Sequence, residues 1–122
     1  MAAPNLQTIS TCNGKTAPLA LANTSETALL TNAASSGKAL RVFNVTVSNS
    51  STTLAADITL RFYNAASGGT AFAIGPVTVP AYGTVIVIGA ENPLYLEEDR
   101  RLTVQASASS QLTVLCSYED IS

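Results

Sequence analysis

The alternation of apolar and polar residues near the C-terminus is the feature that most restricts how this chain can fold. Between residues 101 and 109, leucine, valine and alanine take every second position, and the alternation resumes over residues 112–119 after Ser109-Ser110. A period of two is the period of a β-strand with one buried face, whereas an amphipathic helix repeats every 3.6 residues. The alternation therefore predicts two strands that pair as an antiparallel hairpin through a short polar turn.

Similar patterns upstream predict an all-β chain with little or no helix. The predicted strands before residue 101 cover residues 15–22, 26–31, 39–49, 56–64, 71–79 with an interruption at Gly75-Pro76, 85–88 and 94–96. Short strands separated by turn residues every ~8–12 positions are typical of a sandwich or a jelly roll. We therefore expect an antiparallel β-sandwich, jelly-roll-like, of about eight or nine short strands.

Three of these strands carry more specific expectations about their faces. The alternation over 39–49 places Phe43 on the same face as the two valines that follow it, and the one over 56–64 directs Ile58, Leu60 and Phe62 inward. The run over 85–88 is apolar on both faces, which predicts an interior strand covered on each side. A proline within 15–22 places that strand at a sheet edge, since proline lacks the backbone donor of a central strand.

Length and composition favour a single domain with an almost neutral surface. The 122 residues are 47% hydrophobic and only 11% charged, with a net charge of -2, against about 25% charged residues in an average protein. A weakly acidic chain without a basic cluster is not expected to bind nucleic acid. It also lacks a signal-like N-terminus and any apolar run of about 18 residues, so no membrane association is expected.

No segment carries the pattern of an enzyme active site, so we expect a non-enzymatic protein without a cofactor or a metal. Histidine is absent, which removes the commonest general base and metal ligand. The acidic run at residues 97–99 could hold a calcium ion or form a glycosidase pair, but it is better explained as a solvated turn. Gly68-Gly69 is interpreted as a turn, because no lysine follows as in a phosphate loop. Cys12 and Cys116 are expected to be reduced.

The C-terminal quarter resembles the C-terminal hairpin of small β-sandwich virion proteins of tailed bacteriophages, of the cyanophage and marine-phage type. The matching residues are a leucine-rich strand at 94–96, an acidic turn at 97–99, an alternating strand that ends in Ala106-Ser107, and a closing Ser117-Tyr118-Glu119. The resemblance takes in roughly residues 38–122. It implies a capsid cement or decoration protein made in the host cytoplasm, a homotrimer on the virion surface that binds the major capsid protein.

Two alternatives remain beside this prediction, and the candidate contact residues bear on all of them. The first is a phage neck or tail adaptor or a fibre component, and the second is a carbohydrate-binding sandwich that uses its tyrosines. Residues 1–14 are predicted to be either a first edge strand or an extended arm that grips a neighbour through Leu6 and Ile9. Tyr63 and Tyr82 are the other predicted partner-interface residues.

Overall fold

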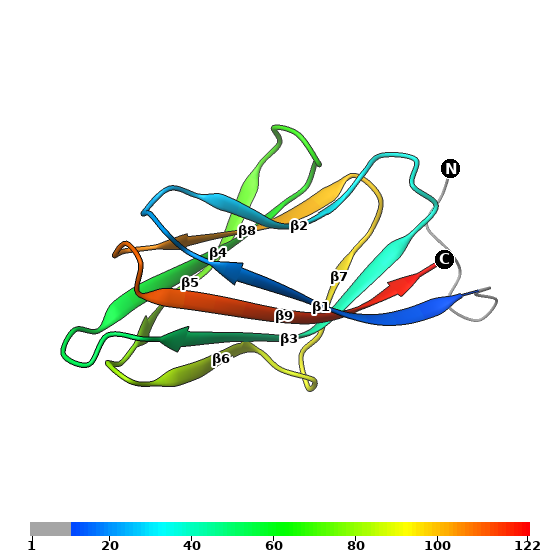
Figure 1. Cartoon of the computed structure of the whole chain (residues 1–122). Coiled ribbons are helices and arrows are strands. Elements are labelled where there is room, and N and C mark those ends of the chain that lie inside the picture. The colour runs from blue at the N-terminus through cyan, green and yellow to red at the C-terminus, as the bar shows by residue number, and fades with distance from the viewer. Residues whose placement is uncertain (1–10) are drawn as a thin grey trace.

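The computed structural model describes residues 11–122 as two packed antiparallel sheets with no helix in that range (Figure 1). This confirms the predicted all-β sandwich. The strands are β1 (Cys12–Ala20), β2 (Thr27–Asn32), β3 (Ala39–Asn49), β4 (Ala56–Tyr63), β5 (Ala71–Val79), β6 (Thr84–Ile88), β7 (Leu94–Leu96), β8 (Arg100–Ala106) and β9 (Leu112–Ile121). Within residues 11–122, no helix is long and apolar enough to span a membrane.

The strands divide into two sheets that mix early and late parts of the chain. Sheet A has the order β1-β9-β3-β6, with β7 also paired to β3, and sheet B has the order β2-β8-β4-β5. Leucine, valine and isoleucine side chains from both sheets fill the space between them, and Val42, Leu60, Val104 and Val114 are fully buried there. The predicted edge position of the first strand is confirmed, because β1 borders sheet A.

The predicted C-terminal hairpin is wrong, although both of its strands exist. Strand β8 lies in sheet B between β2 and β4, whereas β9 lies in sheet A between β1 and β3. The turn between them crosses from one sheet to the other: the Ser107 amide donates to the Asp57 carbonyl in sheet B, and the Ser110 amide donates to the Leu21 carbonyl next to sheet A. Alternation specifies that a strand has one buried face, but not which strand pairs with it.

Two expectations about strand faces also need correction. In β3 the pairing with β9 shifts register between Val42 and Asn44, so Val42 and Val45 are both buried and Phe43 leaves the face of the later valines. A bulge inserts one residue and reverses the alternation on one side of it. Strand β6, expected in the interior, is an edge strand, and Ile86 is 62% exposed because none of residues 11–122 forms a layer over the outside of sheet A. The inward side chains of β4 are as predicted.

Two buried asparagines tie the sheets together at opposite ends of the sandwich. At the end of β3, Asn49 Nδ2 donates to the carbonyls of Leu54 (2.9 Å) and Val79 (3.1 Å), the second of which belongs to sheet B. At the end of β2, Asn32 Nδ2 donates to the carbonyl of Leu96 in sheet A (2.9 Å). Each amide satisfies backbone carbonyls that would otherwise be buried without a partner.

Candidate interaction face

The outer face of sheet A carries a row of side chains that crosses all four of its main strands. The pairing aligns Pro18 of β1 with Leu115 of β9, Leu115 with Thr46 of β3, and Thr46 with Ile86 of β6. Leu115 is 50% exposed and Ile86 is 62% exposed. We call these four residues the central row. It places two large aliphatic side chains on a face that no other described strand covers.

The neighbouring row on the same face is small and uncharged. It consists of Ala20, Thr113, Ser48 and Thr84, which the pairing aligns across the same four strands. Ser48 Oγ and Thr84 Oγ1 share a hydrogen bond of 3.1 Å. Neither row contains a charged residue, so this part of the surface can lose its water at a lower cost than a lysine- or glutamate-rich surface.

The outer face of sheet B has the opposite character, because its polar side chains are joined in pairs. Tyr63 Oη donates to Glu26 (2.7 Å), the Arg101 guanidinium stacks 3.7 Å from the Tyr63 ring centroid, and Arg61 donates to Gln105 (2.7 Å). The hydroxyl of Thr103 also donates to Glu26, and these hydrogen bonds from Thr103 and Tyr63 hold the pKa of Glu26 below its ordinary value. This face is already satisfied by its own polar contacts.

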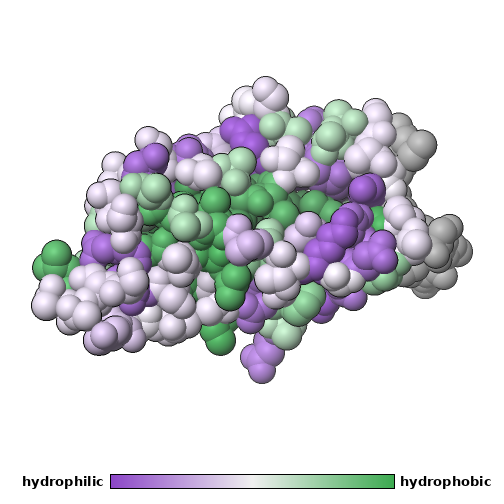
Figure 2. Space-filling model, in the orientation of Figure 1, coloured by the Kyte–Doolittle hydropathy of each residue, from purple (hydrophilic) through white to green (hydrophobic). Residues whose placement is uncertain are grey.

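Charged groups gather at the end of sheet A where β1 begins and β9 ends. Arg41 donates to Glu119 (2.8 Å), and Asp120 accepts from Lys15 (3.0 Å) with Lys38 at 3.5 Å. Figure 2 shows a group of strongly hydrophilic residues to the right of a central band of hydrophobic residues, with further hydrophilic residues along the top and at the left. Sheet A is therefore charged at one end and neutral along its two middle rows.

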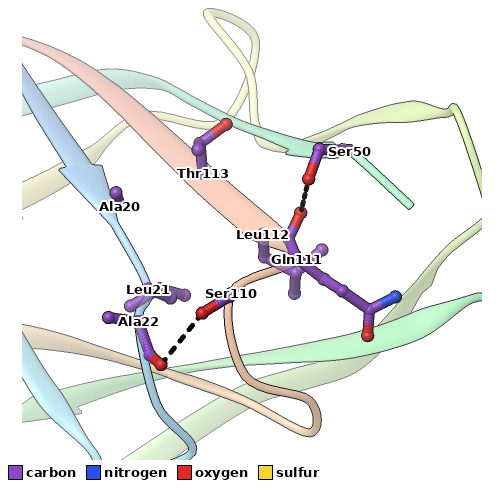
Figure 3. A pocket seen from close by; sticks show the side chains of 8 residues that line it. All are labelled: Ala20, Leu21, Ala22, Ser50, Ser110, Gln111, Leu112 and Thr113. Carbon is purple, nitrogen blue, oxygen red and sulfur yellow. Dashed lines mark hydrogen bonds between the residues drawn. The ribbon is translucent and has the colours of Figure 1, made fainter.

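A shallow cavity of about 220 Å³ opens at the neutral end of the same face. Its lining is uncharged and comes from the end of β1, the start of β9 and the residue after β3, as Figure 3 shows: Ala20, Leu21, Ala22, Ser50, Ser110, Gln111, Leu112 and Thr113. We call this cavity the socket. Its rim is held by the Ser50 hydroxyl on the Gln111 carbonyl (3.1 Å) and the Ser110 hydroxyl on the Ala22 carbonyl (3.3 Å).

The two cysteines occupy different environments, and both are free thiols. Cys12 is exposed at the start of β1, and its Sγ donates to Glu119 (3.4 Å). Its pKa is raised by desolvation and by Glu119, an effect that Arg41 partly opposes. Cys116 faces the core of the sandwich, and burial raises its pKa to about 12. The pairing of β1 with β9 places Cys12 opposite Ile121 and Cys116 opposite Ala17, so the two cysteines do not lie opposite each other.

The acidic run and the paired glycines form two turns that hold each other. Asp99 accepts from the Ala66 amide (2.9 Å), and Arg101 donates to the carbonyls of Ala65 (3.1 Å) and Gly68 (3.0 Å). Gly68 and Gly69 have φ of 69° and 81°, which suits glycine at a tight turn. Within residues 11–122, no three His, Cys, Asp or Glu side chains gather in a way that could hold a metal ion.

Of the predicted contact residues, the two tyrosines lie in different parts of the described structure. Tyr63 lies on the outer face of sheet B in the contacts described above, and Tyr82 is 77% exposed on the turn between β5 and β6. Leu6 and Ile9 lie outside the described residues. The last part of the predicted arm, from Cys12 to residue 14, belongs to β1 and pairs with β9, as the edge-strand alternative anticipated.

The sequence interpretation missed Ile86 and Leu115, although each leaves a trace. Leu115 breaks the alternation of its strand by placing an apolar residue in a polar position, and Ile86 lies in a run that is apolar on both faces. Their alignment in one row depends on the register of β9, β3 and β6, which the sequence does not show.

The comparisons with known proteins bear on the fold. No protein-family model matches the chain, and no curated protein matches it. A solved structure does: a chain of the Bacillus endospore appendages, described as a novel family of disulfide-linked pili. The TM-score is 0.52 at 13% identity, over 90% of this chain and 87% of that one. The two chains share a fold. At this identity the likeness concerns the β-sandwich arrangement alone, and nothing in it is specific to phage capsids.

Proposed function

We propose that this protein is a non-enzymatic structural subunit that associates with copies of itself through the outer face of sheet A. The observation that carries the proposal is the central row, with Leu115 and Ile86 exposed on an uncharged face. The fold it shares with a pilus subunit supports self-association as the class of function. The paired polar groups on the outer face of sheet B favour sheet A as the contact surface.

The energetic argument follows from the exposed aliphatic area. Full burial of a leucine or isoleucine side chain is worth about 1.5–3 kcal/mol. Leu115 and Ile86 are already about half covered within one chain, so a contact would recover about 1 kcal/mol from each. Because two copies bury both pairs, these four side chains contribute about 4 kcal/mol, which offsets only the lower end of the cost of association. The contact between two copies is therefore weak, and repetition in an assembly would strengthen it.

Covalent linkage through disulfides would be limited in this chain. Cys116 is fully buried in the core, which leaves Cys12 as the accessible thiol of the described residues. One thiol per subunit can join two subunits but cannot continue a chain of them. If the protein polymerises, non-covalent contacts must therefore carry the assembly, and a Cys12–Cys12 disulfide would at most reinforce pairs.

The phage assignments remain predictions within the same structural class. A decoration protein, a neck or tail adaptor and a fibre component would each need surfaces for association, and the neutral face of sheet A could serve any of them. Trimer formation, binding to a major capsid protein and location on a virion have no specific support in the contacts described above. Sugar binding by the tyrosines gains none either, since Tyr63 is engaged by Glu26 and Arg101.

Self-association can be tested with one substitution on the face and one matched control. Leu115→Lys places an ammonium group in the central row, whereas Phe72→Lys changes a residue of similar exposure (57%) on β5 of sheet B. Sedimentation velocity up to about 1 mM, a range suited to a weak contact, should show association of the wild type and of Phe72→Lys, and its loss in Leu115→Lys. Circular dichroism checks that all three are folded. A wild type that stays monomeric throughout this range contradicts the proposal.

A further inference from the structure

The central row and the socket have a spacing that predicts how two copies would meet. We propose that the outer face of sheet A packs on the same face of a second copy about a two-fold axis through Leu115, with each Ile86 entering the other copy's socket. This inference rests on the proposed function and adds to it the geometry of the contact.

The spacing follows from the register. Neighbouring strands lie about 4.8 Å apart, and alternate residues on one strand about 6.8 Å apart. Ile86 is two strands from Leu115 along the central row, with Thr46 between them, which makes about 9.6 Å. The socket lies along β9 from Leu115, around Thr113 and Gln111, and the midpoint of these two positions is about 10 Å away. Ile86 and the socket are thus nearly equidistant from Leu115, in perpendicular directions.

This coincidence has a definite consequence for symmetry. The directions from Leu115 to Ile86 and from Leu115 to the socket form a right angle in the face. A two-fold axis that passes through Leu115 in the face and bisects this angle exchanges the position of Ile86 with that of the socket. Leu115 then contacts Leu115 of the second copy on the axis, and an Ile86 side chain fills the socket on each side of it. The strands of the two sheets cross at about 90°, which is one of the two recurrent arrangements for packed sheets.

The chemistry of the face suits a contact between identical surfaces. A two-fold axis brings each group near a symmetric copy of its surroundings, so a charged face would repel itself. Both rows are uncharged, and the charged pair Arg41 and Glu119 lies on the other side of Leu115 from the socket. The socket lining includes Ala20, Ala22 and Leu112, and its volume of about 220 Å³ leaves room for the four carbons of an isoleucine side chain.

The contact is small, and this determines the conditions of the test. Four strands of about 4.8 Å and about 20 Å of strand length give about 400 Å² for each copy. A stable interface typically buries about 800 Å² on each side. We therefore expect an isolated pair to form only at high protein concentration, and a trapping reaction is a better test than equilibrium binding alone.

Disulfide trapping distinguishes this geometry from any other contact through the same face. In a Cys12→Ser background, single cysteines are placed at Leu115, Ile86 or Ala20, and at Thr59 on the outer face of sheet B as the control. Mild oxidation of concentrated protein is followed on non-reducing gels. Leu115→Cys should give dimers at least tenfold faster than Thr59→Cys, because the two thiols meet on the axis. Ile86→Cys alone should remain at the control rate, because its copies lie about 14 Å apart by the same strand spacing.

A mixture provides the second half of the test. Ile86→Cys mixed with Ala20→Cys should give a heterodimer faster than either variant gives a homodimer. Only the mixture places a thiol at position 86 of one copy against a thiol in the socket of the other. Equal trapping rates at Leu115, Ile86 and Thr59, or no preference for the mixed pair, would overturn the geometry. If the wild type associates in sedimentation but the trapping pattern differs, the two-fold contact is wrong while the proposed function stands. A wild type that does not associate contradicts both.

Discussion

The replacement of Asn49 by alanine tests whether a single buried amide holds the two sheets together at the neutral end of the sandwich. The Asn49 side chain makes three hydrogen bonds, two from Nδ2 to the carbonyls of Leu54 and Val79 and one from the Ser51 amide to Oδ1 (2.9 Å). The residue is only 4% exposed, so water cannot easily replace the amide. Alanine removes all three bonds and leaves a small cavity.

The expected loss can be worked out from these contacts. A hydrogen bond contributes about 0.5–1.5 kcal/mol to stability, and a buried polar group left without a partner costs about 1–3 kcal/mol. The Val79 carbonyl bond is buried, whereas the other two lie closer to the surface. The sum is about 3 kcal/mol, a large part of the 5–15 kcal/mol typical of a domain. For a chain of this length, that loss lowers Tm by about 10–15 °C.

Urea unfolding followed by circular dichroism and tyrosine fluorescence measures this loss directly, since the chain has no tryptophan. The matched control is Asn44→Ala, because Asn44 accepts one local bond from Thr46 Oγ1 (2.6 Å) on the half-buried outer part of the same strand. We expect the control to cost less than about 1 kcal/mol. The reasoning is refuted if Asn49→Ala costs no more than Asn44→Ala with an unchanged m-value.

Three further predictions concern Glu26 and the Cys12 thiol. The pKa of Glu26 is lowered by hydrogen bonds from Thr103 and then Tyr63, so these contacts stabilise the fold above pH ~4.3, the ordinary value of glutamate, and the stabilisation is lost as the pH falls through the lower folded pKa. Thermal melts between about pH 3 and 6 cover this titration. The fall in Tm toward acid pH should be smaller for Glu26→Gln than for the wild type. Equal falls would contradict a stabilising role for the ionised Glu26 carboxylate. Oxidation should give a disulfide-linked dimer through Cys12 on non-reducing gels and no larger oligomers, because Cys116 is buried. The dimer should disappear in Cys12→Ser. Larger oligomers would show that Cys116 is accessible. Glu119→Gln should speed the oxidation near neutral pH, because Glu119 helps to raise the pKa of the Cys12 thiol.

The same residues show why the candidate face was harder to predict than the fold. Leu115 and Ile86 lie 29 positions apart in the sequence and become members of one row only through two strand pairings, β9 with β3 and β3 with β6. The socket similarly joins the end of β1 and the start of β9 with the residue after β3. Tyr63 and Tyr82 are predicted contact residues because tyrosine combines a large ring with a polar tip. The sequence does not show that Glu26 and Arg101 engage Tyr63.

The sequence alone determined the all-β class, the approximate number of strands and the inward side chains of β4, because alternation is a local consequence of a pleated strand with one buried face. It also indicated the edge position of β1 and the role of residues 97–99 as a turn, since proline and short polar clusters act within a few residues. Only the tertiary structure decided that β8 and β9 belong to different sheets, that β6 is an edge strand, and that Leu115 and Ile86 share an exposed row. Strand pairing is non-local: each strand can satisfy its backbone bonds with any neighbour of suitable length, and the choice among them comes from the packing of the whole sandwich.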